Sequence, residues 1–399
     1  MNSMFLAILV IASSFIFLQS THTVKNASVD PVMYAPDDQP AWEQNAVAWL
    51  VEAQSSNGGW GAGSHAYQNI TDPHAVQTDP ATTAFAALAL MKAGGPLETN
   101  PYKNQITKAL DRILKDIADR PDNGRITSLT GTQPQVKLGI HIDASMALQF
   151  LTEIRDQIKD AAVETKIDNA AKICITLIQG SQNADGGWAG GGWAPVLQSA
   201  MANNALEGAQ TRYDVDTKAI ENSRRYQAEN ISTDGVRSED AAGVPLYAAV
   251  SAQRATSEES RTVEALIAPG MLNSFSEGKV KKEDLSHELV SQGMDRDKAE
   301  RLVKSYEVNK VSTKALQSDD IWQGFGNNGG EEYLSYMMTS EALAQQNQDD
   351  WLKWRQSIEP KFKQAQNPNG SWSGQHCITS PVFCTAAIVQ AWNAGLSEK

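Results

Sequence analysis

Histidine, aspartate and cysteine side chains precede three Ala-rich segments of the sequence at comparable places. They are His74, Asp79, His141, Asp143, His376 and Cys377. Imidazole, carboxylate and thiolate groups bind zinc in proteins, and they also act as catalytic bases, acids and nucleophiles. We therefore predict a catalytic site from these six residues, in which His141, His376 and Cys377 could hold zinc as a cofactor.

Each of these residues also has a purely structural interpretation. Asp79 and Asp143 stand where helix N-caps are expected, and a histidine near a helix start is more often hydrogen-bonded than metal-bound. In an oxidising compartment Cys377 could instead form a disulfide with Cys384. On one helix these two cysteines would lie about 10 Å apart, too far to bond, so the bridge requires Cys377 in the loop before the helix. Cys174 is predicted to be core.

Six Ala-rich, apolar segments predict the helices that position these residues. They span residues 79–94, 141–154, 194–209, 244–255, 331–344 and 380–395. Four of them begin with a proline, Pro80, Pro195, Pro245 or Pro381, in the first helical turn, where a missing N–H group costs nothing. Small side chains allow such helices to approach one another closely, so we expect them to form an inner layer.

Six longer amphipathic segments alternate with the Ala-rich ones. They span residues 41–54, 101–119, 160–179, 215–229, part of 290–317, and 350–366, and their charged faces indicate solvent exposure. We expect no strand. The alternation predicts an all-α (α/α)6 toroid with six inner and six outer helices, in which the N-termini of the inner helices meet at one mouth and favour anions there.

Three turns share the order apolar helix, Gln, Gly turn, Trp. They are "WLVEAQSSNGGWGAG" (49–63), "SQNADGGWAGGGWAP" (181–195) and "KFKQAQNPNGSWSGQ" (361–375), and "IWQGFGNNGG" (321–330) is a degenerate version. These turns and the six-fold count resemble the QW motifs, or prenyltransferase/squalene-oxidase repeats, of the terpenoid cyclase/protein prenyltransferase superfamily. The resemblance covers roughly residues 40–397 and implies a squalene cyclase-like toroid. It further implies that six residues brace the links between outer and inner helices: Gln54, Trp60, Gln182, Trp188, Gln366 and Trp372.

The motifs that carry chemistry in that superfamily are absent from this sequence. The D-x-C zinc pair of the prenyltransferases is missing, and "HID" at 141–143 is the nearest tripeptide. The D-x-D-D acid of the squalene–hopene cyclases is reduced to "DVDT" at 214–217. Whether the chain is an enzyme therefore stays open.

Aromatic side chains on or near the inner helices are predicted to line a central cavity: Trp193, Tyr247, Phe325, Tyr333, Tyr336 and Phe383. The alternative is that they are core. We predict a protein that binds an apolar small molecule, a peptide or a glycan in this cavity. The alternative is an enzyme of the terpene cyclase/prenyltransferase type or a lyase, with its His/Asp/Cys site at the inner-helix mouth.

The remaining predictions concern organisation and location. Residues 1–20 resemble a signal peptide, which predicts a secreted or periplasmic protein without a stable membrane span after cleavage. Residues 21–40 are expected to be a disordered lead-in to a toroid domain over 41–397. The charged stretch 256–318 is expected to be a helical insert. It could be a lid or a partner-docking surface, or a solvent-exposed insert without a role. A net charge of −13 argues against nucleic acid as a partner.

Overall fold

A computed structural model describes residues 32–33, 39–188, 191–232, 235–236, 244–322 and 329–397. These residues lie in one compact unit, Pro31–Lys399. They form fifteen α-helices, two short 3-10 helices and four two-residue strands. None of the described helices is long and apolar enough to span a membrane.

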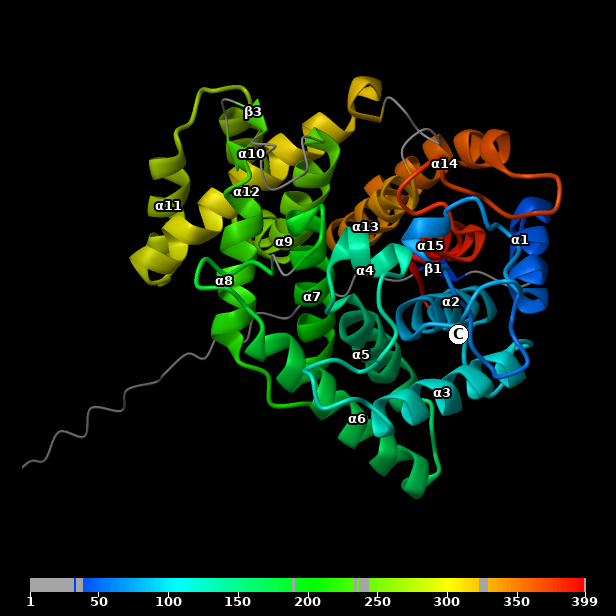
Figure 1. The fold of residues 1–399 in the computed structure, drawn as a ribbon. Helices are drawn as coiled ribbons and strands as arrows, with labels where there is room; N and C mark the ends of the chain where they lie inside the picture. Colours follow the sequence, from blue (N-terminus) through cyan, green and yellow to red (C-terminus); the bar gives the residue numbers. More distant parts are fainter. Residues whose placement is uncertain are drawn as a thin grey trace, which may run out of the picture. The chain divides into compact units, whose positions relative to one another are not determined.

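Six helices form a closed inner ring. They are α2 (Pro80–Gly94), α5 (Ile142–Arg155), α7 (Pro195–Ala209), α9 (Pro245–Leu266), α13 (Gly330–Gln346) and α15 (Pro381–Asn393). Each packs against the next, and α15 packs against α2, which closes the ring (Figure 1). Almost every side chain of α2 and α15 is buried, because small residues on all faces let neighbouring helices pack closely.

Six further helices cover the ring and correspond to the predicted amphipathic segments. They are α1 (Ala41–Glu52), α3 (Lys103–Ala118), α6 (Ala161–Gly180), α8 (Thr217–Ala228), α12 (Arg296–Leu316) and α14 (Gln348–Ala365). In α3 the buried residues Ile106, Ala109, Leu110, Ile113 and Ile117 repeat at helical spacing and face the ring. The predicted fold class, an all-α (α/α)6 toroid, is confirmed.

The first Gln–Gly–Trp turn links α1 to α2 through side-chain hydrogen bonds. Gln54 Nε2 donates to the carbonyl of Gln105 in the next outer helix, α3, at 2.9 Å. Trp60 Nε1 donates back to the carbonyl of Leu50 at 2.9 Å, and the Trp60 backbone N–H donates to Thr83 Oγ1 of the inner helix at 3.0 Å. The turn therefore ties two outer helices and one inner helix together.

The other two turns repeat the same bonds. Gln182 donates to Ala219 of α8, Trp188 to Ile178, Gln366 to Trp42 of α1, and Trp372 to Phe362. The bond from Gln366 joins the last outer turn to the first outer helix. All three Trp rings are buried. Residues 323–328 of the degenerate turn lie outside the described residues.

The charged stretch 256–318 is helical and has its own hydrophobic core. It consists of the second half of α9, α10 (Pro269–Ser276), α11 (Lys282–Ser291) and α12. Val263, Leu272, Leu285, Leu289 and Val303 pack together there as a cluster separate from the main core. The stretch is thus a small packed extension of the fourth inner helix and its outer partner α12.

Two short strand pairs correct the prediction of a chain without strands. β1 (Val32–Met33) pairs in parallel with β4 (Leu396–Ser397), and β2 (Ile231–Ser232) pairs antiparallel with β3 (Gly235–Val236). Of the first pair, only β1 lies within the segment 21–40, the expected disordered lead-in, and its two residues pair with β4. The C-terminal partner strand, which is remote in sequence, supplies the hydrogen bonds that order them.

Candidate functional site

The N-terminal ends of the inner helices bring Asp79 and Asp143 together. Asp79 caps α2, accepting hydrogen bonds from the backbone of Thr82 at 2.8 Å and of Ala62 at 2.9 Å. Asp143, from α5, accepts one from the backbone of Ala81 at 3.2 Å and one from Gln135 Nε2 at 2.7 Å. All four carboxylate oxygens are therefore used by donors of the fold itself.

Burial changes the protonation of this pair. Burial, reinforced by the charge of Asp79, raises the pKa of Asp143 to about 7. Burial also raises the pKa of Asp79, although its backbone donors oppose the shift. The pair therefore holds a proton near neutral pH. Its carboxylate oxygens nevertheless accept hydrogen bonds from the fold and have a structural role.

A second group at this end surrounds Cys377 in the loop before α15. Cys377 Sγ lies 2.8 Å from Nδ1 of the exposed His376. Its backbone has φ 71°, a strained value for a residue other than glycine. Burial raises the pKa of the Cys377 thiol; Lys137 opposes this shift, and the charge of Glu331 adds to it. The thiol is thus held in its neutral form, which is a weak nucleophile.

The six predicted catalytic residues do not form one site. His74 is exposed and lies in a turn where its backbone N–H donates to Asp72. His141 is half-buried, and burial together with the charge of Arg125 lowers its pKa. The structure pairs only Asp79 with Asp143 and His376 with Cys377.

The predicted zinc ligands His141, His376 and Cys377 are likewise not assembled. Within the described ranges, no three His, Cys, Asp or Glu side chains are grouped so that they could hold a metal ion. The disulfide is not formed either. Cys377 and Cys384 are both free thiols, and Cys384 is buried in α15 with its sulfur directed at the carbonyl of Ile378.

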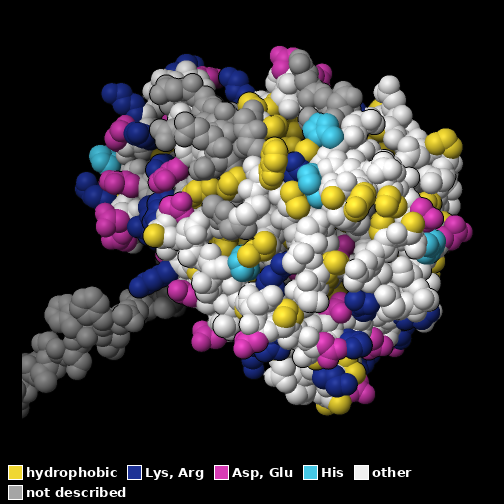
Figure 2. Space-filling view, viewed as in Figure 1, with side chains coloured by type: hydrophobic (Ala, Val, Ile, Leu, Met, Phe, Trp, Pro, Cys, Tyr) yellow, Lys and Arg dark blue, Asp and Glu magenta, His cyan; other side chains and the backbone are white. Residues whose placement is uncertain are grey.

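Most of the predicted cavity aromatics belong to the core. Tyr247, Tyr333, Tyr336 and Phe383 are buried, and Phe325 lies outside the described residues. Trp193 differs, since it is 65 % exposed and Lys137 Nζ lies 4.1 Å from the centre of its ring. The face over α4 (Gln133–Leu138), which carries Lys137, has apolar and His side chains near its middle and most charged side chains towards its edges (Figure 2).

The opposite end of the ring contains a pocket of about 530 Å³ that the sequence analysis missed. Residues near the C-terminal ends of five inner helices, and from the middle of the longer α9, line it together with Arg224 of α8. The inner helices contribute Lys92 from α2, Glu153 from α5, Asn204 and Glu207 from α7, Arg254 and Arg261 from α9, Glu341 from α13, and Gln390 from α15. The lining is therefore charged and amide-rich.

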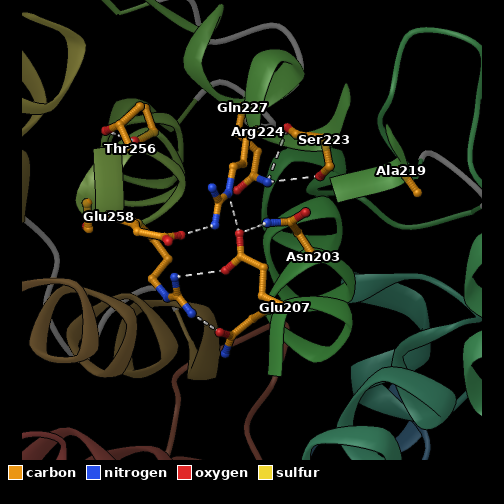
Figure 3. Close-up of polar contacts among 12 residues, drawn as sticks. Asn203, Glu207, Ala219, Ser223, Arg224, Gln227, Thr256 and Glu258 are labelled. Carbon is orange, nitrogen blue, oxygen red and sulfur yellow. Dashed lines mark hydrogen bonds and ion pairs between the residues drawn. The ribbon is translucent and has the colours of Figure 1, made fainter. Parts of the chain in front are cut away.

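Glu207 is the centre of a hydrogen-bonded network on one wall of this pocket (Figure 3). Its Oε1 accepts from Arg224 Nε at 2.6 Å and from Asn203 at 2.7 Å, and its Oε2 accepts from Arg254 at 3.2 Å. Arg224 also donates to Glu258 at 2.6 Å. The network joins α7, α8 and α9 and holds both guanidinium groups in place.

An ion pair forms the other wall. Lys92 Nζ lies 2.9 Å from Oε1 of Glu341, and both side chains are largely buried. Burial alone would lower the pKa of Lys92, but the carboxylates of Glu341 and Glu153 outweigh this effect and raise the pKa. Lys92 therefore stays charged in the pocket.

Comparison with a known family agrees with this architecture. Residues 22–113 match the family model of the squalene-hopene cyclase C-terminal domain. The matched range contains α1, α2 and the first Gln–Gly–Trp turn. Over this range the chain is similar to that family, which agrees with a terpenoid cyclase-like fold. No curated protein has a sequence that matches it.

Within this terpenoid cyclase-like ring, the pocket had a signal in the sequence. Charged residues interrupt the Ala-rich inner segments near their ends, as in "NNALEGA" (203–209) and "VSAQRATSEES" (250–260). A charge within a segment that is buried on every face must meet a partner or a cavity. The residues chosen from the sequence lie instead at or before helix starts, where Asp79 is an N-cap and Asp143 accepts from the backbone of Ala81.

Proposed function

We propose that this chain is an exported ligand-binding protein whose central pocket takes a polar ligand. The observation that supports the proposal is the pocket of about 530 Å³ on the ring axis, to which all six inner helices contribute side chains. Its volume falls within the range of roughly 300–1,000 Å³ that is typical of small-molecule sites. Export rests on the apolar N-terminal segment of the sequence.

The lining favours a peptide or a glycan over an apolar molecule. Lys92, Glu207, Arg254 and Glu341 would lose contact with water if an apolar ligand filled the pocket, and burying charged groups without compensation is costly. A polar ligand replaces the lost water contacts with hydrogen bonds of its own. The five predicted aromatic residues that the structure describes, all except Phe325, are not among the residues that line this pocket.

An enzyme acting at the N-terminal mouth is supported less well by the geometry. The carboxylates of Asp79 and Asp143 already accept hydrogen bonds from the fold, and the Cys377 thiol is not activated by its surroundings. A catalytic residue must be able to reach a substrate. At the C-terminal end, the charged side chains face a cavity that a ligand can enter.

Blocking the pocket tests the proposal. Gly208 lines the pocket, lies within α7, and has no atom within 4 Å of the position that a Cβ would take. Gly208→Phe should therefore fill the pocket without disturbing the helix, because most residues favour a helix more than glycine does. Gly180→Phe is the matched control, since Gly180 of α6 has equally open surroundings and is not among the lining residues.

The measurement is calorimetric titration of the mature protein with trialanine, a tetramer of N-acetylglucosamine, and farnesol. We expect one of the two polar probes to bind at one site per chain, with binding lost in Gly208→Phe and kept in Gly180→Phe. Binding of farnesol alone would contradict the proposal. So would equal binding to both glycine variants, or no binding of any probe.

A further inference from the structure

We propose that the pocket recognises a short peptide with both termini free, binding its ammonium group at Glu341 and its carboxylate at Arg261. This inference rests on the proposed function, because it names the ligand class of the same pocket. It depends on charged groups of the lining that the fold leaves without a full set of partners.

The pocket lining carries equal numbers of acidic and basic side chains. The acids are Glu153, Glu207, Glu258 and Glu341, and the bases are Lys92, Arg224, Arg254 and Arg261. Arg224 and Arg254 are bound by Glu207 and Glu258, and Lys92 is bound by Oε1 of Glu341. A wall with balanced charges suits a ligand that itself carries one charge of each sign.

Several lining groups have hydrogen-bonding atoms without a partner, Arg254 Nε and Thr152 Oγ1 among them, and two are not satisfied by an opposite charge. Oε2 of Glu341 is buried and has no hydrogen-bond partner. Arg261 has no carboxylate within ion-pair distance in the part of the chain that the structure describes. Its guanidinium makes only a 3.5 Å contact with the carbonyl of Gln345. A buried carboxylate oxygen without a donor attracts an ammonium group. A guanidinium group without a carboxylate partner attracts a carboxylate.

The helix ends strengthen the site for the ammonium group. α7, α13 and α15 have no basic residue in the last turn, so the partial negative charge of their C-termini is not compensated by side chains of those turns. Glu341 lies in the turn before the last turn of α13, beside Lys92 in the last turn of α2. The uncompensated helix ends therefore favour a second cation at this end of the ring, and Oε2 of Glu341 is a partner for it.

The spacing of the two spare groups fits a very short peptide. Glu341 and Gln345 are four residues apart on α13, which places them about one helical turn, or roughly 5–6 Å, from each other. Arg261 lies against Gln345. The termini of an extended dipeptide or tripeptide are separated by roughly 3.3–3.6 Å per residue, and the reach of the arginine side chain covers the remainder.

Arg261 is available only because α9 is longer than the other inner helices. α9 runs for 22 residues to Leu266, where it packs into the separate core of the charged extension. This extension supports the turn of α9 that carries Arg261 at the edge of the pocket. The extension thus supplies the group that selects a free carboxylate.

Chemical capping of the ligand tests the assignment without any change to the protein. Calorimetric titration of the whole mature chain would compare trialanine with N-acetyl-trialanine and with trialanine amide. Each cap removes one charged hydrogen-bonded contact, so each should weaken binding at least about tenfold. Equal affinity for free and capped peptides would overturn the inference, while loss of binding in Gly208→Phe would still support a polar-ligand pocket.

Two variants assign each terminus to its residue. Glu341→Gln should weaken binding of trialanine at least about tenfold and have little further effect on the N-acetylated peptide. Arg261→Gln should do the same with the amide. Glu52→Gln, the same change at an exposed residue of α1, should leave all three affinities unchanged. If the loss of affinity from a cap and the loss from its matching variant add up when the two are combined, the assignment is wrong. Binding of the N-acetylglucosamine tetramer in place of trialanine would identify a glycan ligand and also overturn it.

Discussion

The two ends of the inner ring use acidic residues in opposite ways. At the N-terminal end, Asp79 and Asp143 are enclosed and accept hydrogen bonds from backbone N–H groups. At the C-terminal end, Glu207 and Glu341 bind side chains of Arg and Lys and line an open pocket. The same residue type is thus structural at one end and available for recognition at the other.

The reason is the polarity of the helix backbone. The first turn of a helix exposes N–H donors that a nearby carboxylate satisfies at once. The last turn exposes carbonyl oxygens, to which a carboxylate cannot donate, so an acid there must find a cation. Six parallel inner helices repeat this asymmetry around the ring. The N-terminal end, at which the sequence analysis predicted the catalytic site, is therefore the end at which the aspartates already accept hydrogen bonds from the backbone.

The largest expected effect concerns the braces of the N-terminal end. Trp188→Ala removes a buried ring and its hydrogen bond to Ile178, so it should lower the free energy of unfolding by about 3–5 kcal/mol. Trp193→Ala, five residues later and exposed, should change it by less than about 0.5 kcal/mol. Urea unfolding measures both. Similar losses in the two variants would contradict a purely structural role for the turn.

The next effect concerns the C-terminal network. Glu207→Ala leaves Arg224 with only Glu258 and Arg254 with no carboxylate partner, and the expected loss of stability is about 3 kcal/mol. Glu52→Ala on the exposed face of α1 is the control, with an expected change below about 0.5 kcal/mol. A loss in Glu207→Ala no larger than in the control would show that the network does not hold α7, α8 and α9 together.

The smallest effect distinguishes the two ends by pH. Burial raises the pKa of Asp143 from its ordinary value of 3.8 to about 7. Between pH 5 and 7 the folded chain therefore keeps a proton that the unfolded chain has released, and the stability due to Asp143 falls as pH rises. Asp143→Asn removes this dependence. Between pH 5 and 7 its free energy of unfolding should therefore fall by roughly 2 kcal/mol less than that of the unmodified chain.

Unfolding experiments at pH 5, 6 and 7 would measure the difference. Asp122→Asn, at an exposed position, is the control, and its free energy of unfolding should change with pH as that of the unmodified chain does. An unchanged slope in Asp143→Asn would mean that Asp143 titrates as an exposed acid does, and that the two ends do not differ in this way.

Much of the fold was predictable because its signals are local. Small-residue periodicity and proline at the first turn locate α2, α7, α9 and α15, and the Gln–Gly–Trp turns show how the layers are joined. The strand pair of Val32–Met33 with Leu396–Ser397 was missed because its hydrogen bonds join residues from opposite ends of the sequence. The placement of Asp79 and Asp143 at the same end of the ring agrees with the predicted parallel inner helices.

The site itself depended on contacts that no local pattern encodes. Whether Asp79 is a catalyst or a cap depends on whether backbone donors such as the N–H of Ala62 reach it, and the chain path between the helices determines this. Likewise, the role of Glu207 depends on Arg224 and Arg254 from two other helices.

The class of helix at each position and the order of the layers could be read from residue spacing, because burial on one face or on all faces sets that spacing. Which acids meet backbone donors and which meet cations depended on how the helices pack. An acid at a helix start and an acid at a helix end look alike in a sequence. Their surroundings differ only after the six helices have packed side by side and the longer α9 has extended the wall at one end.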